Sequence, residues 1–134
     1  MENASTTQPR WRTVIRPKLL LVDDEDNLRE LYRLELNEEG YDVQVAADAS
    51  EAIRLLTAAK YDLVILDIQM PGMYGIDLLQ KIVARDRQQA VILNTSYASY
   101  RDNFMAWSAD AYIEKSFDMS ALKRAIREVL ARHL

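Results

Sequence analysis

Acidic residues cluster at two points of the chain, each at the end of an apolar run. Asp23 and Asp24 end the run LLLV and are followed by two further acids, and Asp67 ends the run LVIL. Adjacent carboxylates repel one another, so a doublet of this kind either lies on a solvated turn or is held together by a positive group. The doublet by itself leaves both readings open.

A hydroxyl and an ammonium group occupy similar places later in the chain. Thr95 follows the apolar run AVILN, and Lys115 follows AYIE. Either residue alone is most simply a capping or solvated side chain at the end of a strand. Together with the carboxylates they form a coherent set. The carboxylates offer hard oxygen ligands for Mg²⁺, which prefers one or two carboxylates, waters and phosphate oxygens. A divalent cation would also offset the repulsion between the carboxylates of the acidic cluster.

The composition disfavours other kinds of site. The chain has no cysteine, which excludes thiolate chemistry, and its single histidine, His133, stands next to the C-terminus, where we expect a solvated side chain. The net charge of −4 argues against direct binding of nucleic acid. No apolar run approaches the roughly 20 residues that span a bilayer, so we expect no membrane partner and a cytoplasmic location.

The elements that position these residues alternate along the chain. With 134 residues, of which 49% are hydrophobic, the chain is long enough for one domain with a real core. Five apolar runs predict strands: KLLLV, YDVQVA, YDLVILD, AVILN and AYIE. Helical spacing covers Leu28–Leu36, Ser50–Ala58, a stretch from about Gly75, a less regular stretch around Tyr100–Trp107, and Met119–Ala131.

Single residues predict where three of these helices begin or end. Gly40 is expected to stop the first helix. Asp48 or Ser50 can cap the second helix, and Asp118 or Ser120 can cap the last one.

Alternating strands and helices are typical of an α/β fold with a parallel sheet covered on both faces. The runs LLLV and LVIL are apolar at consecutive positions, as in strands buried on both faces, whereas YDVQVA alternates and predicts an edge strand. Ligands bind at the carboxyl ends of the strands in such sheets. The five candidate residues stand at those ends: Asp23, Asp24, Asp67, Thr95 and Lys115.

Residues 1–17 differ from the rest of the chain. They are small and polar and then basic, with prolines at positions 9 and 17. We interpret them as a leader, which its composition predicts to be flexible, that precedes a domain of residues 18–134.

The segments LLLVDDED, LVILDIQMPGMYG, VILNTS and AYIEKSF, in this order, resemble the receiver domain of two-component response regulators, the CheY-like superfamily. The resemblance covers roughly Lys18 to Ala131. It implies a flavodoxin-like, doubly wound (βα)5 fold with a five-stranded parallel sheet in the order 2-1-3-4-5. It also implies that the chain receives its phosphoryl group from a sensor histidine kinase or a phosphotransfer protein.

The resemblance assigns a role to each candidate residue. Asp67 is the phosphoacceptor, and Mg²⁺ is held by Asp23, Asp24, Asp67 and the backbone carbonyl of Gln69. Lys115 pairs with one phosphoryl oxygen and the hydroxyl of Thr95 reaches another. Tyr112 stands at the aromatic switch position of the family.

The implied function is a signalling switch that is not an enzyme acting on an outside substrate. Phosphorylation is expected to draw Thr95 inward, to let Tyr112 turn into the space that Thr95 vacates, and to reshape one surface. That surface comprises the expected fourth helix, the fifth strand and the fifth helix. It is the candidate contact for a downstream protein or an output domain, and a candidate homodimer interface.

Two other functions stay open. A Mg²⁺-dependent phosphohydrolase with an aspartyl nucleophile uses a related fold, but it typically carries a second aspartate two residues after the nucleophile. This chain has Gln69 there, which cannot transfer a proton at neutral pH. The other alternative is an interaction module that has the fold but is not phosphorylated.

The chain also departs from the family pattern. In the family, the lysine at the end of the fifth strand is commonly followed by proline, often through a cis bond. In this chain the corresponding Lys115 is followed by Ser116. A cis bond before a residue other than proline costs about 2.5–4 kcal/mol, so we predict a trans Lys115–Ser116 bond, or a strained cis bond if the site demands it. Ser108 stands where a glycine often ends the fourth helix. Tyr97 is placed, together with Gln69, to shield an acyl phosphate from water.

Overall fold

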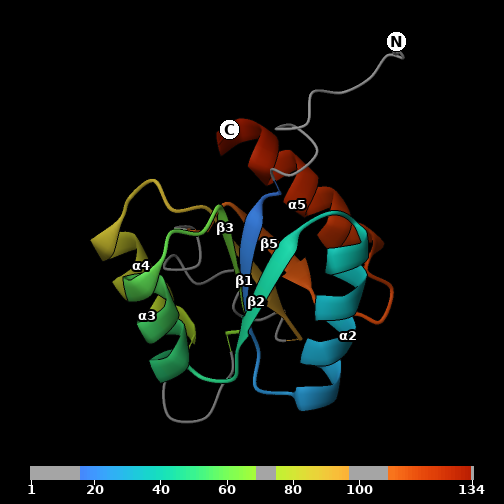
Figure 1. Cartoon of the computed structure of the whole chain (residues 1–134), viewed down its shortest axis with the longest axis horizontal. Coiled ribbons are helices and arrows are strands. Elements are labelled where there is room, and N and C mark those ends of the chain that lie inside the picture. Colours follow the sequence, from blue (N-terminus) through green and yellow to red (C-terminus); the bar gives the residue numbers. More distant parts are fainter. Residues whose placement is uncertain (1–15, 69–74, 97–108, 134) are drawn as a thin grey trace.

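Five strands form one parallel sheet in the order β2-β1-β3-β4-β5 in the computed structural model, which describes residues 16–68, 75–96 and 109–133 (Figure 1). The strands are β1 (Lys18–Val22), β2 (Asp42–Ala46), β3 (Leu63–Leu66), β4 (Val91–Thr95) and β5 (Ala111–Glu114). The helices of the described residues are α2 (Asp26–Glu38), α3 (Ala49–Ala58), α4 (Gly75–Arg85) and α5 (Ser120–His133). The predicted strand order and fold class are confirmed.

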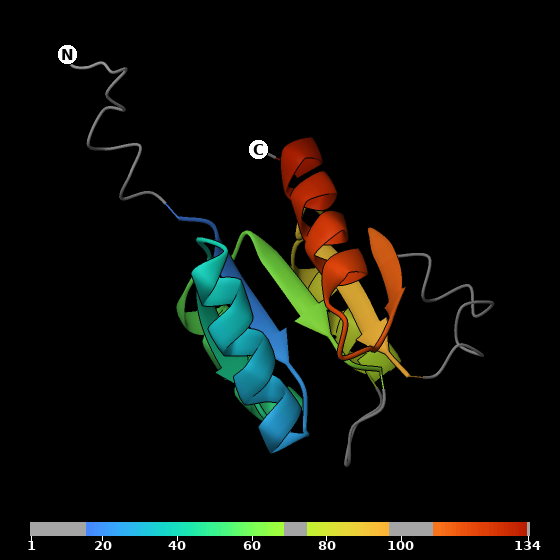
Figure 2. The same ribbon diagram turned by 90° about the vertical axis from the view of Figure 1, so that its right-hand side faces the viewer.

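Helices cover both faces of the sheet. Helices α2 and α5 lie on one face, as Figure 2 shows, and α3 and α4 lie on the other. Alternate strand residues point to opposite faces, so each face has its own core. Leu20 and Val22 of β1 pack with α3 and α4, whereas Leu19 and Leu21 pack with α2 and α5.

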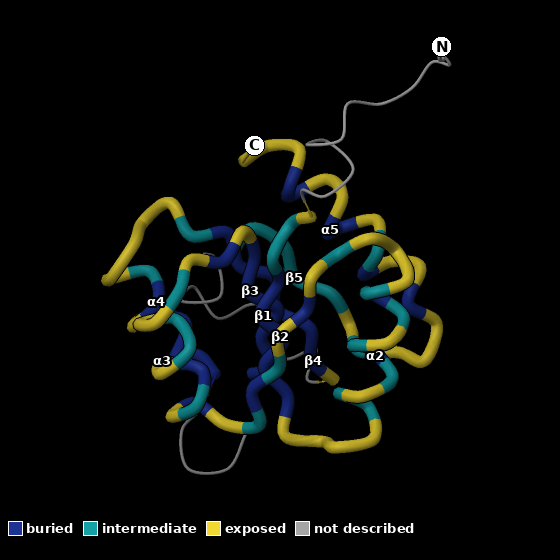
Figure 3. Tube along the Cα trace, in the orientation of Figure 1, coloured by how far each residue is buried: buried dark blue, intermediate teal, exposed yellow. Residues whose placement is uncertain are grey.

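Burial follows strand position in the sheet. Every residue of β3 and β4 is buried, and so are the last four residues of β1 (Figure 3). Strand β2 lies at one edge and alternates between exposed and buried residues along its first three positions, as YDVQVA predicted. The central strands therefore form a rigid base that carries the acidic residues at their carboxyl ends.

Helix ends match the predicted capping residues. Helix α2 ends just before Gly40, whose φ of 104° lies in the left-handed region that glycine tolerates and whose N–H donates to the Asn37 carbonyl at 3.1 Å. Asp48 caps α3 by accepting a hydrogen bond from the Glu51 N–H at 2.8 Å. Asp118 accepts from the N–H of Ser120, the first residue of α5, at 2.9 Å.

Some predictions fall outside the described residues. These are the structure of the leader at residues 1–15, the loop at residues 69–74, and the helix expected around residues 100–107. In the part of the chain that the structure describes, every helix is too short or too polar to cross a membrane.

Candidate functional site

The register of the sheet brings Asp23 and Asp67 next to each other. Val22 pairs with Leu66 in the ladder between β1 and β3, and the N–H of Asp67 donates to the Val22 carbonyl at 3.0 Å. The residue that follows β1 is Asp23, whose N–H donates to the Ala46 carbonyl of β2 at 3.1 Å. Backbone hydrogen bonds on both sides thus determine where the two carboxylates emerge.

Three carboxylates converge at this rim. Asp23, Asp24 and Asp67 each offer one oxygen, and these oxygens lie within 4.8 Å of one another. Asp23 and Asp67 are only 2% and 5% exposed, whereas Asp24 faces solvent. Two buried carboxylates with an exposed third suit Mg²⁺, which binds few protein oxygens and keeps several waters. The residues present therefore fit the predicted ion.

The Lys115 ammonium stands among these carboxylates. Its Nζ lies 2.8 Å from an Asp67 oxygen, 2.9 Å from an Asp23 oxygen and 3.1 Å from a Glu25 oxygen. The Lys115 side chain is 8% exposed, so these charge-assisted hydrogen bonds are partly shielded from water. The acidic run is thus not merely a solvated turn, because a positive group holds it together.

Burial and charge act in opposite directions on the pKa values of these groups. Burial lowers the pKa of Lys115, but hydrogen bonds from its ammonium to Asp67 and Asp23 outweigh burial and raise that pKa above its usual value. Burial is the largest influence on Asp23 and raises its pKa, although the Glu25 N–H and Lys115 oppose the rise. Lys115 is therefore charged at neutral pH and acts as a fixed cation.

Glu25 and Arg29 shape the turn after β1, although neither was among the predicted site residues. The Glu25 N–H donates to an Asp23 oxygen at 2.9 Å, while the Glu25 carboxylate contacts Lys115. Arg29 donates to the Asp23 carbonyl at 2.7 Å and to Asp26 at 2.6 Å. The spacing of Asp26 and Arg29, three residues apart at the start of a helix, was the signal for their pairing.

Thr95 and Tyr112 occupy the two strands beyond Asp67. Thr95 is completely buried at the end of β4, and its carbonyl accepts from the Lys115 N–H at 2.8 Å. Tyr112 on β5 pairs with Leu93, two residues before Thr95, and is half-buried against the core shared with α3 and α4. Thr95 thus stands at the carboxyl end of β4, as predicted, and Tyr112 lies further back along β5. The switching roles of both residues stay predictions.

Gly75 holds the chain close to Asp67. Its N–H donates to the Ile68 carbonyl at 2.5 Å, and a Cβ built on Gly75 would overlap the Asp67 carbonyl oxygen and the backbone of Ile68. A side chain is therefore excluded at the start of α4 by close backbone approach. Gln69, the predicted carbonyl ligand, and Tyr97 and Ser108 lie outside the described residues.

The loop after β5 adopts the predicted peptide geometry. The described residues contain no cis peptide bond, so the Lys115–Ser116 bond is trans. The Ser116 carbonyl accepts a hydrogen bond from the hydroxyl of Tyr32 on α2 at 2.8 Å. This contact joins residues 84 positions apart, and the spacing of residues along the chain does not reveal it.

His133 is exposed, as predicted, but its ring has a partner. Its Nε2 lies 3.0 Å from an oxygen of Asp110, and the other oxygen of that carboxylate accepts from the Val91 N–H at 2.8 Å. These contacts lie at the amino ends of β4 and β5, at the opposite end of the sheet from the acidic rim.

A hollow of about 340 Å³ also lies near the amino ends of β3 and β4; its lining includes Lys60, Arg85 and Gln89.

Comparisons with known proteins agree with this geometry. A family model described as "Response regulator receiver domain" matches residues 19–127. The response regulator ArlR of Staphylococcus saprophyticus is 32% identical over 116 residues, which are 86% of this chain and 53% of ArlR. ArlR of Staphylococcus aureus has the same identity and coverage. The chain thus spans about half the length of these curated relatives.

Solved structures show the same fold. The response regulator TrrA of Thermotoga maritima, crystallised with Mg²⁺-BeF, superposes with a TM-score of 0.82 at 41% identity, covering 84% of this chain and 98% of TrrA. A CheY-like receiver domain protein of Methanospirillum hungatei gives a TM-score of 0.84 at 30% identity, covering 89% of this chain and 97% of that protein. TrrA has also been crystallised with the histidine kinase ThkA, and that match covers 85% of this chain at 41% identity.

Proposed function

Because the chain belongs to the response regulator receiver family, we propose that it is a phosphorylation-controlled switch whose phosphoacceptor is Asp67. The observation that carries this proposal is the position of Asp67 within the site. Its carboxylate lies within 4.8 Å of two other acidic ligand atoms and 2.8 Å from the Lys115 ammonium. A nucleophilic carboxylate flanked by a cation site and a fixed ammonium is what phosphoryl transfer requires.

In the proposed reaction, an Asp67 carboxylate oxygen forms a bond to phosphorus while the bond from phosphorus to its donor breaks. The donor keeps that electron pair, and Asp67 becomes an acyl phosphate. Bound Mg²⁺, held by Asp23, Asp24, Asp67 and the Gln69 carbonyl, would supply charge compensation for the phosphoryl oxygens. Lys115 would keep its place beside Asp67 and donate to a phosphoryl oxygen, since its stem is already packed in the rim.

Phosphorylation would add about 1.5 to 2 negative charges and new acceptor oxygens at this rim. Thr95 is the buried hydroxyl on the strand beside β3, and Tyr112 lies two register positions back on β5. We infer that Thr95 turns toward the phosphoryl group and that Tyr112 follows it inward. The change would reach the surface of β5, α5 and the helix expected around residues 100–107.

The partners follow from the same proposal. The phosphoryl donor would be a sensor histidine kinase or a phosphotransfer protein, as the crystallised pair of ThkA and TrrA supports. The output would be a downstream protein or a further domain, and the chain itself would not turn over an outside substrate.

We further propose that residues 18–134 are the receiver unit and that residues 1–17 form a leader. Arg16, which donates to the Gly40 carbonyl at 3.0 Å, lies at the junction.

Intact mass spectrometry after incubation with acetyl phosphate and Mg²⁺ tests the proposal. The native chain should gain the mass of one phosphoryl group, and Asp67→Asn should gain none. Asp42→Asn, which removes an exposed carboxylate from β2 at the far end of the sheet, is the matched control and should react like the native chain. No mass gain in the native chain would favour the unphosphorylated interaction module. Steady turnover of a generic phosphate ester would favour the phosphohydrolase.

A further inference from the structure

The hydroxyl of Tyr32 crosses the interior to reach the loop that carries Lys115. Tyr32 belongs to α2, is 1% exposed and packs in the core shared by α2 and α5. Its hydroxyl donates to the Ser116 carbonyl at 2.8 Å. A buried tyrosine keeps its hydroxyl bonded because an unpaired one is unfavourable in an apolar core. The bond therefore links the first helix of the domain to the residue that follows the site lysine.

Further hydrogen bonds hold the same loop from other sides. The Lys115 N–H donates to the Thr95 carbonyl at 2.8 Å, which extends the pairing of β5 with β4. The hydroxyl oxygen of Ser116 accepts from the Asp118 N–H at 3.1 Å. Asp118 in turn accepts from the Ser120 N–H at the start of α5. The loop is thus tied to β4 before Ser116, to α5 after it, and to α2 through Tyr32.

The loop needs such a restraint because Ser116 itself does little to restrict the backbone conformation. A proline after the lysine would fix its own φ and restrict the backbone of Lys115. Serine imposes neither restriction, and Ser116 is exposed, so solvent competes for its backbone groups. The Lys115 side chain begins at this backbone and must bring Nζ to hydrogen-bonding distance of Asp67 and Asp23. Small changes at Ser116 therefore shift the ammonium relative to the carboxylates.

We propose that Tyr32 is a positioning residue for Lys115, its hydroxyl holding the Ser116 carbonyl so that the ammonium stays aimed at Asp67; the role rests on the phosphoacceptor function proposed above. Tyr32 acts only through the loop. Nothing in the described structure brings its hydroxyl to the carboxylates themselves, and its bond is to the backbone of Ser116.

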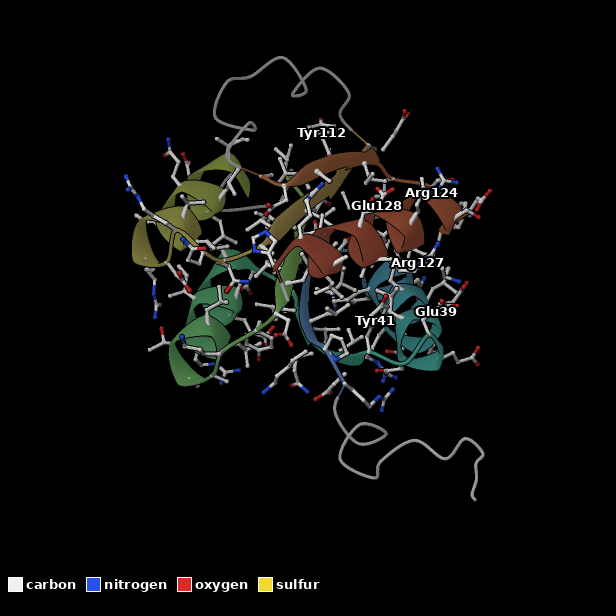
Figure 4. The ribbon with its side chains drawn as sticks, turned by 90° about the horizontal axis from the view of Figure 1, so that it is seen from above. Glu39, Tyr41, Tyr112, Arg124, Arg127 and Glu128 are labelled. Carbon is white, nitrogen blue, oxygen red and sulfur yellow. The ribbon has the colours of Figure 1, made fainter. Side chains whose placement is uncertain are left out.

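Tyr32→Phe is the direct test because it removes the hydroxyl and keeps the ring in the core. The measured quantity is the initial rate of Asp67 phosphorylation by acetyl phosphate in the 134-residue chain at saturating Mg²⁺. One neutral hydrogen bond corresponds to a decrease of about 2- to 10-fold, which is the change expected. Tyr41→Phe is the matched control. Tyr41 lies beside α2, on the other side of α5 from Tyr112 (Figure 4), and its loss of a hydroxyl should leave the rate unchanged.

A double-mutant comparison separates positioning from general loosening of the domain. If Tyr32 acts through the ammonium, Tyr32→Phe should slow the native chain but not a Lys115→Ala chain, whose rate is already low. Magnesium affinity adds a second readout, since Asp23, Asp24 and Asp67 follow β1 and β3, whereas the Tyr32 hydroxyl donates to the loop after β5. Tyr32→Phe should bind Mg²⁺ at least as tightly as the native chain, whereas general loosening would weaken binding.

Ser116→Ala provides a variant that cannot disturb the core. It removes the hydroxyl that accepts from Asp118 and should also slow phosphorylation. A native rate in Tyr32→Phe would overturn the proposal whatever the rate of Ser116→Ala, as would an equal slowing by Tyr32→Phe with and without the Lys115 ammonium. Failure of the native chain to be phosphorylated at Asp67 would instead contradict the proposed function, so the two failures are distinguishable.

Discussion

Lys115 Nζ lies 2.8 Å from Asp67 Oδ2 and also contacts Asp23 and Glu25, so one ammonium serves as the shared counterion of three carboxylates. Two of these carboxylates belong to the predicted cation site. An ion bound there would share the Asp23 and Asp67 oxygens with Lys115. The lysine and the cation are therefore linked through common ligands, and the stability of the domain should reflect that linkage.

Lys115→Met should destabilise the domain when Mg²⁺ is absent. The change keeps an apolar stem but leaves Asp23 and Asp67 buried without their cation, a loss of about 3 kcal/mol in the free energy of unfolding. Urea denaturation in chelator measures it. Added Mg²⁺ should recover part of the loss, because the ion replaces the missing charge. An unchanged midpoint in chelator would show that the ammonium contributes nothing to folding.

Magnesium should raise the unfolding free energy of the native chain. An ion that binds only the folded state stabilises it by about 2.7 kcal/mol at a concentration 100 times its dissociation constant. The increase is measured as the shift in the thermal unfolding midpoint when Mg²⁺ is added. Asp24→Asn keeps the buried Asp23 and Asp67 and removes the exposed ligand, so it should abolish most of this shift. Glu38→Gln, at the exposed end of α2, should retain the full shift. Equal shifts in both variants would place the ion elsewhere.

Gly75→Ala should disturb the site as well as the fold. Its Cβ would overlap the backbone of Asp67 and Ile68, and overpacking of this kind costs about 1–3 kcal/mol. Because the displaced backbone carries Asp67, phosphorylation should slow too. Gly40→Ala is the control. It strains a left-handed residue at the end of α2, where a Cβ meets nothing within 4 Å, so it should lower stability without slowing phosphorylation.

Asn94→Val should stabilise the domain. Asn94 is 3% exposed on β4, and its Oδ1 has no hydrogen-bond partner among the described residues. A buried unpaired carbonyl costs about 1–3 kcal/mol, and valine suits a central strand, so an increase of about 1 kcal/mol is expected. Denaturant unfolding measures it, with Gln44→Val at an exposed position of β2 as comparison. A decrease would show that the amide is satisfied in solution.

Stability conferred by Asp118 should vanish at low pH. Hydrogen bonds from Ser120 hold the pKa of Asp118 below its usual value of 3.8. A lowered pKa contributes stability above the unfolded value, and that contribution is lost as the pH falls through the folded value. The difference in unfolding midpoint between the native chain and Asp118→Ala should therefore be constant near neutrality and shrink below about pH 4. A difference that is independent of pH would contradict this role.

Much of the fold was predictable because patterns of neighbouring residues along the sequence indicated its strands and helix ends. Consecutive apolar residues in LLLV and LVIL indicated strands buried on both faces, and the alternation in YDVQVA indicated an edge strand. Gly40 and Asp48 marked helix ends through conformational freedom and side-chain capping. The candidate site followed from the same patterns, since carboxyl ends of parallel strands share one rim.

The sequence by itself determined which groups stand at the strand ends, because strand period and apolar runs are properties of neighbouring residues. Only the tertiary structure decided how those groups meet. The contact of Lys115 with Glu25, the bond from Tyr32 to Ser116 and the pairing of His133 with Asp110 join residues far apart along the chain. Such contacts depend on the register of strands and the packing of helices, and no local pattern of side chains specifies them.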